Sequence, residues 1–444
     1  MDLKRHKPAR RGVSAGTIVM LLATALVLAG FLLLLPTFTG NQDIRIDAAK
    51  LAVAMDQSFS QLAASTEELL EKHPPNVMLP SEILATAPPA AAQPVAAAAT
   101  PTPVPPPPKR SFSLCASGSV IWNTSVRKTL TFDDASRFDI LTDQIEGALA
   151  ADLSYAALDN TLTSAKLSDV NMPPEMLLPL REAGINTIAI GHRHILNNGL
   201  DGMAETSQTV KNAGLLPIGS SGVILQDYNG VQVALLHYLE EISSTGRKQV
   251  GEAERKEALA FIEESRILSD IASAKEAGAE VVVVSLRWGK NGASSPTNDQ
   301  ISLAQKIADA GGDIILGTGS GVLQPVKVLS ANRGDQRYHP VLCAYSLGNL
   351  FTHDRENRST LCSILLNAKV IYDPVNQTVA FENLSYTPTY AWRGKEGKRT
   401  LLRVLLNDGE TYPDFVGSDQ KKVMERCYAQ VTDVMAETGI PMAE

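Results

Sequence analysis

The residues best suited to chemistry in this 444-residue sequence lie in two short segments rich in imidazole, guanidinium and ammonium groups. One is His192-Arg193-His194, and the other holds Arg287 and Lys290. In an extended segment alternate residues share a face, so His192 and His194 could together ligate one metal ion. Guanidinium groups instead suit a carboxylate or a phosphate, which makes an anion pocket the competing interpretation. A purely structural interpretation is that these histidines are packed or solvent-facing loop residues.

Alternating strands and helices, predicted from residue 110 onward, must position these segments. The alternation of short apolar runs with amphipathic stretches is typical of an α/β fold, here a sandwich of mixed β-sheets flanked by helices. Chemistry in such folds sits on the loops after strand carboxyl ends, and both segments follow predicted strands. The predicted strands are 111–121, 153–158, 186–190, 222–225, 231–238, 280–286 and 313–316, with β-rich sequence from 322 to about 390. The predicted helices are 137–150, 173–182, 203–212, 252–277, 299–310 and 418–438.

Several of these loops resemble the CapA family of capsule and poly-γ-glutamate synthesis proteins. The similarity covers roughly 111–355 and is centred on 183–199. Its most specific element is Tyr345-Ser-Leu-Gly-Asn349 followed by an aromatic residue two positions on, which is a hallmark of that family. Further matches, in family order, are 208–214, 217–219, 283–289, 300–304, 310–317 and 322–326.

The resemblance implies a calcineurin-like metallophosphoesterase sandwich, whose members hold two divalent metal ions with Asp, Glu, Asn and His side chains. This sequence departs from that ligand set early in the chain. The first family Gly-Asp falls on Gly118-Ser119, so its carboxylate is missing. The family Asn-Leu-Glu keeps only the shorter acid Asp159, and the acid three residues after His194 is replaced by Asn197.

The later ligand positions differ as well. Arg287 replaces the histidine before Trp-Gly, and the Gly-His-x-His motif becomes 317–321, which contains no histidine. Arg193 and Arg287 would therefore place two cations where metal ions bind in the family. We expect the dinuclear centre to be absent and no cofactor to be required, with a single divalent metal ion at Asp159, His192 and His194 as the alternative.

The resemblance thus predicts a cleft between these loops. Its candidate catalytic residues are His194 and Asp159. The glycine-rich segment 317–321 lacks the Lys-Ser/Thr and the following helix of a phosphate-binding loop, so we predict no nucleotide site there. The candidate ligand-binding residues are Ser119, His192, Arg193, Arg287, Lys290, Thr318 and Asn349.

The N-terminal region predicts a membrane anchor. Residues 1–12 hold five basic residues and one acidic residue, and the 24 residues from 13 to 36 carry no charge. A helix of that length spans the roughly 30 Å hydrocarbon layer, whereas a cleaved signal peptide has a shorter apolar region that ends in small residues. The positive-inside rule then predicts a single-pass protein of the cell membrane, with residues 1–12 cytoplasmic and the main domain extracytoplasmic.

A stalk and a spacer are predicted between this anchor and the main domain. Apolar residues recur at spacings of three and four between 44 and 72, so 41–80 is predicted to be an amphipathic helical stalk. The stripe could pair with its own copy, with a membrane partner subunit, or with the nearest domain. Residues 81–110 are rich in Pro and Ala and predict a semi-rigid linker. The CapA-like domain is assigned to 111–393 and a C-terminal extension, with a helix packed on the domain, to 394–444.

The four cysteines are too few and too scattered for a disulfide scaffold, and none forms a Cys-x-x-Cys pair. Cys343 and Cys362 both lie in strand-like apolar stretches. An extracytoplasmic setting permits a disulfide between them, and small buried free thiols are an equally good interpretation.

Composition narrows the range of functions. Forty basic against 48 acidic residues give a net charge of −8, which argues against a nucleic-acid binder, and long apolar runs exclude a fully disordered chain. The favoured hypothesis is a membrane-anchored accessory or anionic-polymer-binding component of capsule or poly-γ-glutamate type polymer synthesis. The alternative is an active metal-dependent phosphoesterase or polymer hydrolase with a rearranged site.

Overall fold

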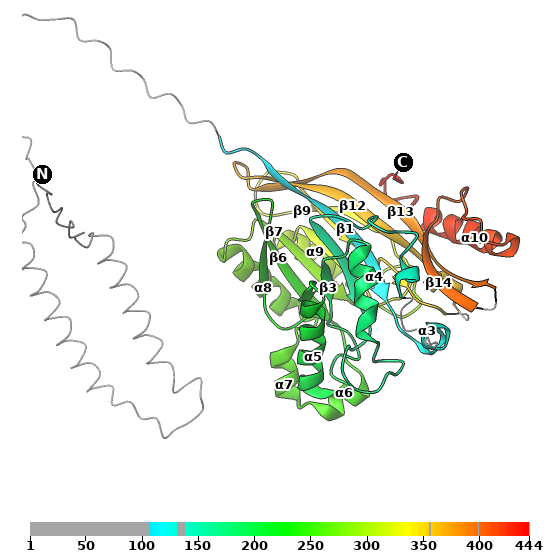
Figure 1. Cartoon of the computed structure of the whole chain (residues 1–444). Coiled ribbons are helices and arrows are strands. Elements are labelled where there is room, and N and C mark those ends of the chain that lie inside the picture. The colour runs from blue at the N-terminus through cyan, green and yellow to red at the C-terminus, as the bar shows by residue number, and fades with distance from the viewer. Residues whose placement is uncertain (1–105, 131–137, 355–356, 398, 444) are drawn as a thin grey trace, which may run out of the picture. The chain divides into compact units, whose positions relative to one another are not determined.

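The structure is a computed structural model that describes residues 106–130, 138–354, 357–397 and 399–443 (Figure 1). The predicted cytoplasmic tip 1–12, anchor 13–36, stalk 41–80 and nearly all of the linker 81–110 lie outside these residues. No helix within the described ranges is both long and apolar enough to cross a membrane. The anchor and the location that it implies therefore stay predictions.

Two β-sheets form the frame of the described part. The larger sheet has eight strands in the order β14-β13-β12-β1-β2-β3-β4, with β11 paired to β1. The pairs β1–β2, β2–β3, β3–β4 and β1–β11 are parallel. The pairs β1–β12, β12–β13 and β13–β14 are antiparallel. The bounds are β1 Arg110–Val120, β2 Leu153–Leu158, β3 Thr187–Ala189, β4 Leu216–Ile218, β11 Asn349–Phe351, β12 Cys362–Asp373, β13 Thr378–Glu396 and β14 Arg399–Leu406.

The smaller sheet has six strands in the order β5-β6-β7-β8-β10-β9, of which β6, β7, β8 and β10 are parallel. The β5–β6 hairpin turns at Asn229 and Gly230, both with positive φ, as a tight hairpin turn requires. The bounds are β5 Ile224–Tyr228, β6 Val231–Leu239, β7 Val281–Arg287, β8 Ile314–Thr318, β9 Val326–Ala331 and β10 His339–Ala344.

The main core lies between the two sheets. In β7, Val281 and Val283 face this core, while Val282 and Val284 face a second cluster with the helices on the outer side. Because both faces of the strand are buried, its sequence is a continuous apolar run. Helices α8 (Glu264–Glu276) and α9 (Asn298–Asp309) cover the outer face of the six-stranded sheet.

Other helices cover the outer face of the larger sheet. They are α3 (Thr124–Leu130), α4 (Leu177–Glu182) and α5 (Gly199–Asn212), with the short turns η2 (Asp139–Leu141) and η3 (Pro174–Met176). The short helices α6 (Ser244–Gln249) and α7 (Glu252–Ala258) pack near the end of β6. The predicted sandwich of mixed sheets flanked by helices is confirmed.

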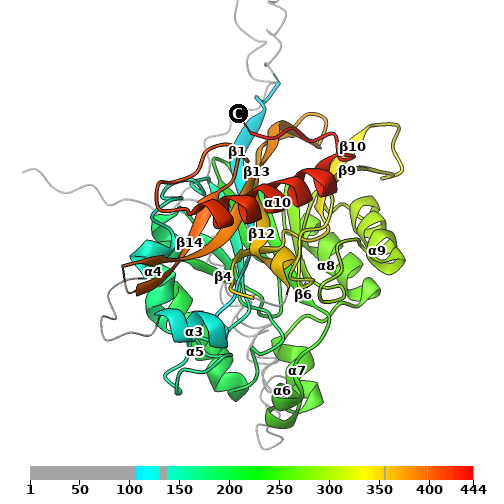
Figure 2. The same ribbon diagram turned by 90° about the vertical axis from the view of Figure 1, so that its right-hand side faces the viewer.

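The C-terminal helix α10 (Ser418–Met435) lies across β12 and β13, as Figure 2 shows. Its buried residues Met424, Cys427, Val431 and Met435 join the core between the sheets. The boundary drawn at 393 falls inside β13, and β14 beyond it is a strand of the larger sheet.

Two predicted helices are wrong in part. Within 138–150 only η2 is helical and the remainder forms turns, because Gly147 has a φ of 71°, which a right-handed helix does not accommodate. The helix expected at 252–277 is two helices, α7 and α8. Between them the backbone pairs with the end of β6, where Leu239 N–H donates to Ala260 and Ile262 N–H donates to Leu239.

The cysteines pair differently from the expected candidates. The disulfide joins Cys362 to Cys427, whereas Cys343 and Cys115 are free and buried. Cys343 lies in the six-stranded sheet and faces the helices on its outer side, while Cys362 starts β12 in the other sheet and faces the main core. A Cys343–Cys362 bond is therefore excluded, because the two side chains lie on different faces of different sheets.

Candidate functional site

A cleft of about 890 Å³ lies where the carboxyl ends of the parallel strands of both sheets come together. Its walls come from loops that follow β1, β2 and β3 in one sheet, and β6, β7 and β8 in the other. This is the position at which α/β folds bind ligands. Six of the nine candidate site residues line the cleft: Asp159, Arg193, His194, Arg287, Lys290 and Asn349.

The other three candidates are not lining residues. Ser119 lies within β1, between its partners on β2 and β11, and is 7 % exposed. Thr318 ends β8, where its carbonyl oxygen accepts the Trp288 N–H at 2.9 Å. His192 is fully buried. The side chains of these three residues are therefore buried in the protein interior and do not face the cleft.

Four carboxylates in the cleft were missed by the sequence analysis. Glu240 and Glu241 directly follow β6, and Glu240 Oε2 accepts the Gly289 N–H at 3.0 Å. The available signal was their position, because they follow a predicted strand just as Arg287 does. Asp299, in the first turn of α9, and Asp354 also line the cleft.

The central contact of the cleft joins Arg287, the last residue of β7, to Asp159, the first residue after β2. Arg287 Nε and Nη2 lie 2.9 and 2.8 Å from the same oxygen, Asp159 Oδ1. The two side chains are only 18 % and 22 % exposed, so solvent screens the pair less than it screens a surface pair. Arg287, which was expected to place a cation where metal ions bind in the family, is paired with Asp159, the acid that was predicted to be catalytic.

The other cations of the cleft are more accessible. Arg193 lies 3.5 Å from Glu241, with both side chains about half exposed, and such pairs contribute little. Lys290 forms no ion pair with a residue in the described part of the chain. Counted over the lining residues, carboxylates exceed cations by two. The carboxylates are Asp159, Glu240, Glu241, Asp299 and Asp354, and the cations are Arg193, Arg287 and Lys290.

A chain of hydrogen bonds determines which nitrogen of His194 carries the proton. Ser243 Oγ accepts the Gly246 N–H at 3.0 Å, so its hydroxyl donates to Asn197 Oδ1. Asn197 Nδ2 must then donate to His194 Nδ1, 3.3 Å away, which leaves the ring hydrogen on Nε2. Burial lowers the pKa of His194, and Arg287 and Arg193 lower it further while Asp159 opposes them. His194 is therefore a neutral donor at Nε2.

His192 is held in the same tautomer. Its Nδ1 accepts the backbone N–H of His194 at 3.1 Å, so Nε2 carries the hydrogen, and that atom is buried on the side of the Asn160 backbone. Burial lowers the pKa of His192 well below its usual value, followed by the effects of Arg287 and His194. Residues 193–198 form turns, so the extended geometry in which the two histidines share a face is absent.

His237 positions the loop that carries these residues. Its Nε2 donates to the Gly191 carbonyl at 2.7 Å, so its Nδ1 accepts from Ser285, whose Oγ accepts from the Tyr155 hydroxyl at 2.7 Å. Burial lowers the pKa of His237 to about 4, so the ring is neutral. A Cβ atom at Gly191 would lie 2.5 Å from the His237 ring, which explains the glycine at this position. His237 therefore has a structural role, because both of its ring nitrogens are bonded to groups in the protein interior.

The donor set does not fit a metal ion. Asp159 Oδ1 is bound twice by Arg287, and both histidines have committed their lone pair at Nδ1 to an N–H of the protein. The His192 and His194 ring centres are 6.4 Å apart. Among the described residues, no group of three or more His, Cys, Asp or Glu side chains is arranged to hold a metal ion. The arrangement can bind carboxylates and donate hydrogen bonds.

Comparison with known proteins was informative at the level of sequence. A family model described as bacterial capsule synthesis protein PGA_cap matches residues 113–354. The capsule biosynthesis protein CapA of Bacillus anthracis is 28 % identical over 185 residues, which is 39 % of this chain and 42 % of that protein. The PGA biosynthesis protein CapA of Bacillus subtilis is 24 % identical over 258 residues, 51 % of this chain and 64 % of that protein.

A probable polyglutamine synthesis accessory protein of Mycobacterium tuberculosis is 22 % identical over 222 residues, 47 % of this chain and 57 % of its own length. The chain thus spans about half the length of the curated relatives that it matches.

Among solved structures, a phosphatase of Mycoplasma pneumoniae matches with a TM-score of 0.38 and 11 % identity, over 67 % of this chain and 94 % of that one. The calcineurin-like phosphoesterase YfkN of Bacillus subtilis matches with a TM-score of 0.35 and 12 % identity, over 73 % and 98 %.

Proposed function

The chain belongs to the family of bacterial capsule synthesis proteins described as PGA_cap, and from this premise we propose that it is an accessory component of surface-polymer synthesis that binds an acidic polymer in its cleft. The proposed polymer is of the capsule or poly-γ-glutamate type, because the relatives are named for synthesis of such polymers. Binding, rather than hydrolysis at a dinuclear metal centre, is supported by one observation above all. Two nitrogens of the Arg287 guanidinium bind one oxygen of the Asp159 carboxylate, so that oxygen is already engaged by a cation of the protein.

Two cations of the cleft can receive polymer carboxylates. Lys290 has no ion-pair partner in the described part of the chain, and Arg193 can exchange its weak contact with Glu241 for a polymer carboxylate. His194 Nε2–H adds a neutral donor, and Arg287 remains paired with Asp159. Because carboxylates outnumber cations in the lining, the affinity should be modest. Salt screens the contacts that Lys290 and Arg193 make with polymer carboxylates, so binding should weaken as salt is added.

We further propose that the domain works outside the cytoplasm and is held at the membrane by 13–36. The Cys362–Cys427 disulfide supports this location, because disulfides persist mainly in oxidising compartments. The uncharged run after a basic segment supports an anchor.

The test measures binding of poly-γ-glutamate to the purified full chain in detergent at low and high salt. Binding should be weakened by Lys290→Ala and further by Lys290→Ala combined with Arg193→Ala. Lys369→Ala is the matched control, because Lys369 is an exposed lysine on β12 that pairs with Glu382 on β13 and does not line the cleft. Absence of binding at low salt, or equal weakening by the control, would overturn the proposed ligand.

The hydrolase alternative is tested on the same preparation. The full chain is incubated with Mn²⁺, Fe²⁺ or Zn²⁺, and its metal content and phosphodiesterase turnover are measured. Stoichiometric metal together with turnover, both lost in His194→Ala, would replace the binding role with an enzymatic one. Polymer binding by metal-free protein with no turnover supports the proposal.

A further inference from the structure

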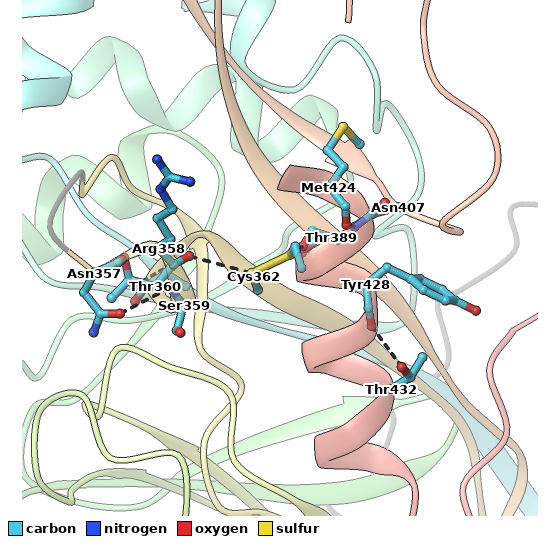
Figure 3. The surroundings of a disulfide bond; sticks show 12 residues. Asn357, Arg358, Ser359, Thr360, Cys362, Thr389, Asn407, Met424, Tyr428 and Thr432 are labelled. Atoms are coloured by element: carbon cyan, nitrogen blue, oxygen red, sulfur yellow. Dashed lines mark hydrogen bonds between the residues drawn. A yellow bond between two sulfur atoms is a disulfide. The ribbon is translucent and has the colours of Figure 1, made fainter. Parts of the chain in front are cut away.

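A disulfide joins the C-terminal helix to one wall of the cleft. Cys362 is the first residue of β12 and directly follows the turn η4 (Arg358–Leu361), and Cys427 lies in the middle of α10. Figure 3 shows η4, the disulfide and α10 side by side. The Cα atoms of the two cysteines are 5.6 Å apart, and each residue is 3 % exposed.

The turn η4 belongs to the cleft. Thr360 lines it, and its carbonyl oxygen accepts a hydrogen bond from Asn349 Nδ2 at 3.1 Å. The same Asn349 nitrogen donates to the Gly321 carbonyl at 2.8 Å. Residues 321, 349 and 360, from three separate segments, are therefore linked through one amide, so a displacement of η4 would reach the loop after β8.

The remaining hydrogen bonds recorded for η4 hold its own shape. Asn357 Oδ1 accepts the Ser359 N–H at 3.2 Å, and the Thr360 hydroxyl donates to the Asn357 carbonyl at 2.6 Å. These bonds do not attach the turn to its surroundings. Its attachment comes from the Asn349 bond, from Leu361, which is buried in the main core, and from Cys362, which pairs with Tyr390 on β13 and is joined covalently to α10.

Helix α10 is itself firmly seated. Met424, Val431 and Met435 are buried in the main core, and the Met424 carbonyl accepts from Asn407 Nδ2 at 2.9 Å. We infer that Cys362 and Cys427 are positioning residues of the cleft, whose disulfide transmits the placement of α10 to η4 and Asn349. Both cysteines lie beyond the 113–354 segment that matches the family, so this support is supplied by the C-terminal part of the chain.

Without the disulfide, a polar side chain at either position would still have a hydrogen-bond acceptor nearby. Cys362 Sγ lies 3.7 Å from the Arg358 carbonyl oxygen, and Cys427 Sγ lies 3.8 Å from that of Thr389. A hydroxyl or thiol at each position would have an acceptor nearby. The Cys362→Ser/Cys427→Ser double variant is therefore expected to fold, with α10 still packed through its apolar residues.

The experiment is hydrogen–deuterium exchange on the full chain in detergent, comparing wild type with the double serine variant. Amide exchange in 357–366 and 345–351 should rise about tenfold or more, while exchange in α9 stays unchanged. The matched comparison is Met424→Ala, which weakens the packing of α10, made with and without the disulfide. With the disulfide it should raise exchange both in α10 and in 357–366. In the double serine background it should raise exchange in α10 with no further rise in 357–366.

Two results would overturn the inference. One is a double variant whose increased exchange is confined to α10. The other is a Met424→Ala substitution that raises exchange in 357–366 by the same factor with and without the disulfide, since packing alone would then couple the helix to the turn. If the double variant does not fold, wild-type chain reduced by an external dithiol, which becomes oxidised as two thiols form, is measured in the same way with the same two criteria. No polymer is used, so failure here leaves the proposed binding role untouched.

Discussion

Arg287 binds Asp159 through two nitrogens that share one carboxylate oxygen, and this contact connects the two sheets of the protein at the base of its cleft. The pair joins residues 128 positions apart in the chain. At positions where the family resemblance predicts metal ligands, the protein therefore has an ion pair with no net charge. The cations of the cleft that can contact a ligand are therefore Lys290 and Arg193, and His194 adds a neutral donor.

Arg287→Met should lower the free energy of unfolding by about 1–3 kcal/mol, because it leaves the Asp159 carboxylate largely buried without its partner. Adding Asp159→Leu should restore part of that loss. A double-mutant cycle measured by urea unfolding checks the coupling. Two independent, additive losses would show that the ion pair contributes nothing to stability.

Acidification should destabilise the domain through His237. Its pKa is lowered to about 4 in the folded state, against an ordinary value near 6.5, so its contribution is complete above about pH 6.5 and is lost as pH falls toward 4. The loss from this residue amounts to about 3 kcal/mol by pH 4. His192 and His194, whose pKa values are also lowered, act in the same direction.

Urea unfolding of the domain at a series of pH values measures this loss. The variant His237→Gln, which keeps a donor for Gly191, should show a shallower pH dependence than wild type. Equal slopes for the two proteins would exclude His237 as the source.

Gly191→Ala should lower stability by about 1–3 kcal/mol, because the added Cβ would lie 2.5 Å from the His237 ring. Gly417→Ala is the matched control, since the nearest atom to its Cβ would be 3.9 Å away and its φ of −69° suits alanine. Thermal unfolding of both variants measures the difference. A Gly191→Ala protein as stable as the control would contradict the close approach.

Asn197→Asp should reverse the tautomer of His194. A carboxylate can only accept, so His194 would donate from Nδ1 and expose a lone pair at Nε2, and its pKa should rise because of the added negative charge. NMR titration of the His194 ring checks the pKa, and Zn²⁺ titration checks whether metal affinity is gained. Asn198→Asp, on the exposed neighbouring position, is the control; an identical response in both variants would point to a general charge effect.

Removal of the Cys362–Cys427 disulfide should cost about 4 kcal/mol of stability by loop-closure entropy for a separation of 65 residues. Cys343→Ala, which removes a buried free thiol, serves as the comparison. Thiol titration of the unfolded, unreduced chain should detect two of the four cysteines. Detection of all four would refute the disulfide.

Much of the fold was predictable because its signals are local. The run from Val281 to Leu286, the Asn229-Gly230 turn and the amphipathic stretch of α9 each encode an element within a few residues. The helix expected at 252–277 was wrong because its backbone between α7 and α8 pairs with Leu239, a partner from another element. The spacing of apolar residues along one segment does not reveal a backbone pairing with a distant strand.

The sequence by itself determined the family and the alternation of strands and helices, and it predicted substitutions at the positions where the family resemblance implies metal ligands. The tertiary structure alone decided that Arg287 is paired with Asp159, that Asn197 sets the proton on His194, and that Cys362 bonds to Cys427. The physical reason is that element type follows from side-chain spacing along the chain. Ion pairs, tautomers and disulfides instead depend on which faces of two stacked sheets and a C-terminal helix are brought within a few ångströms.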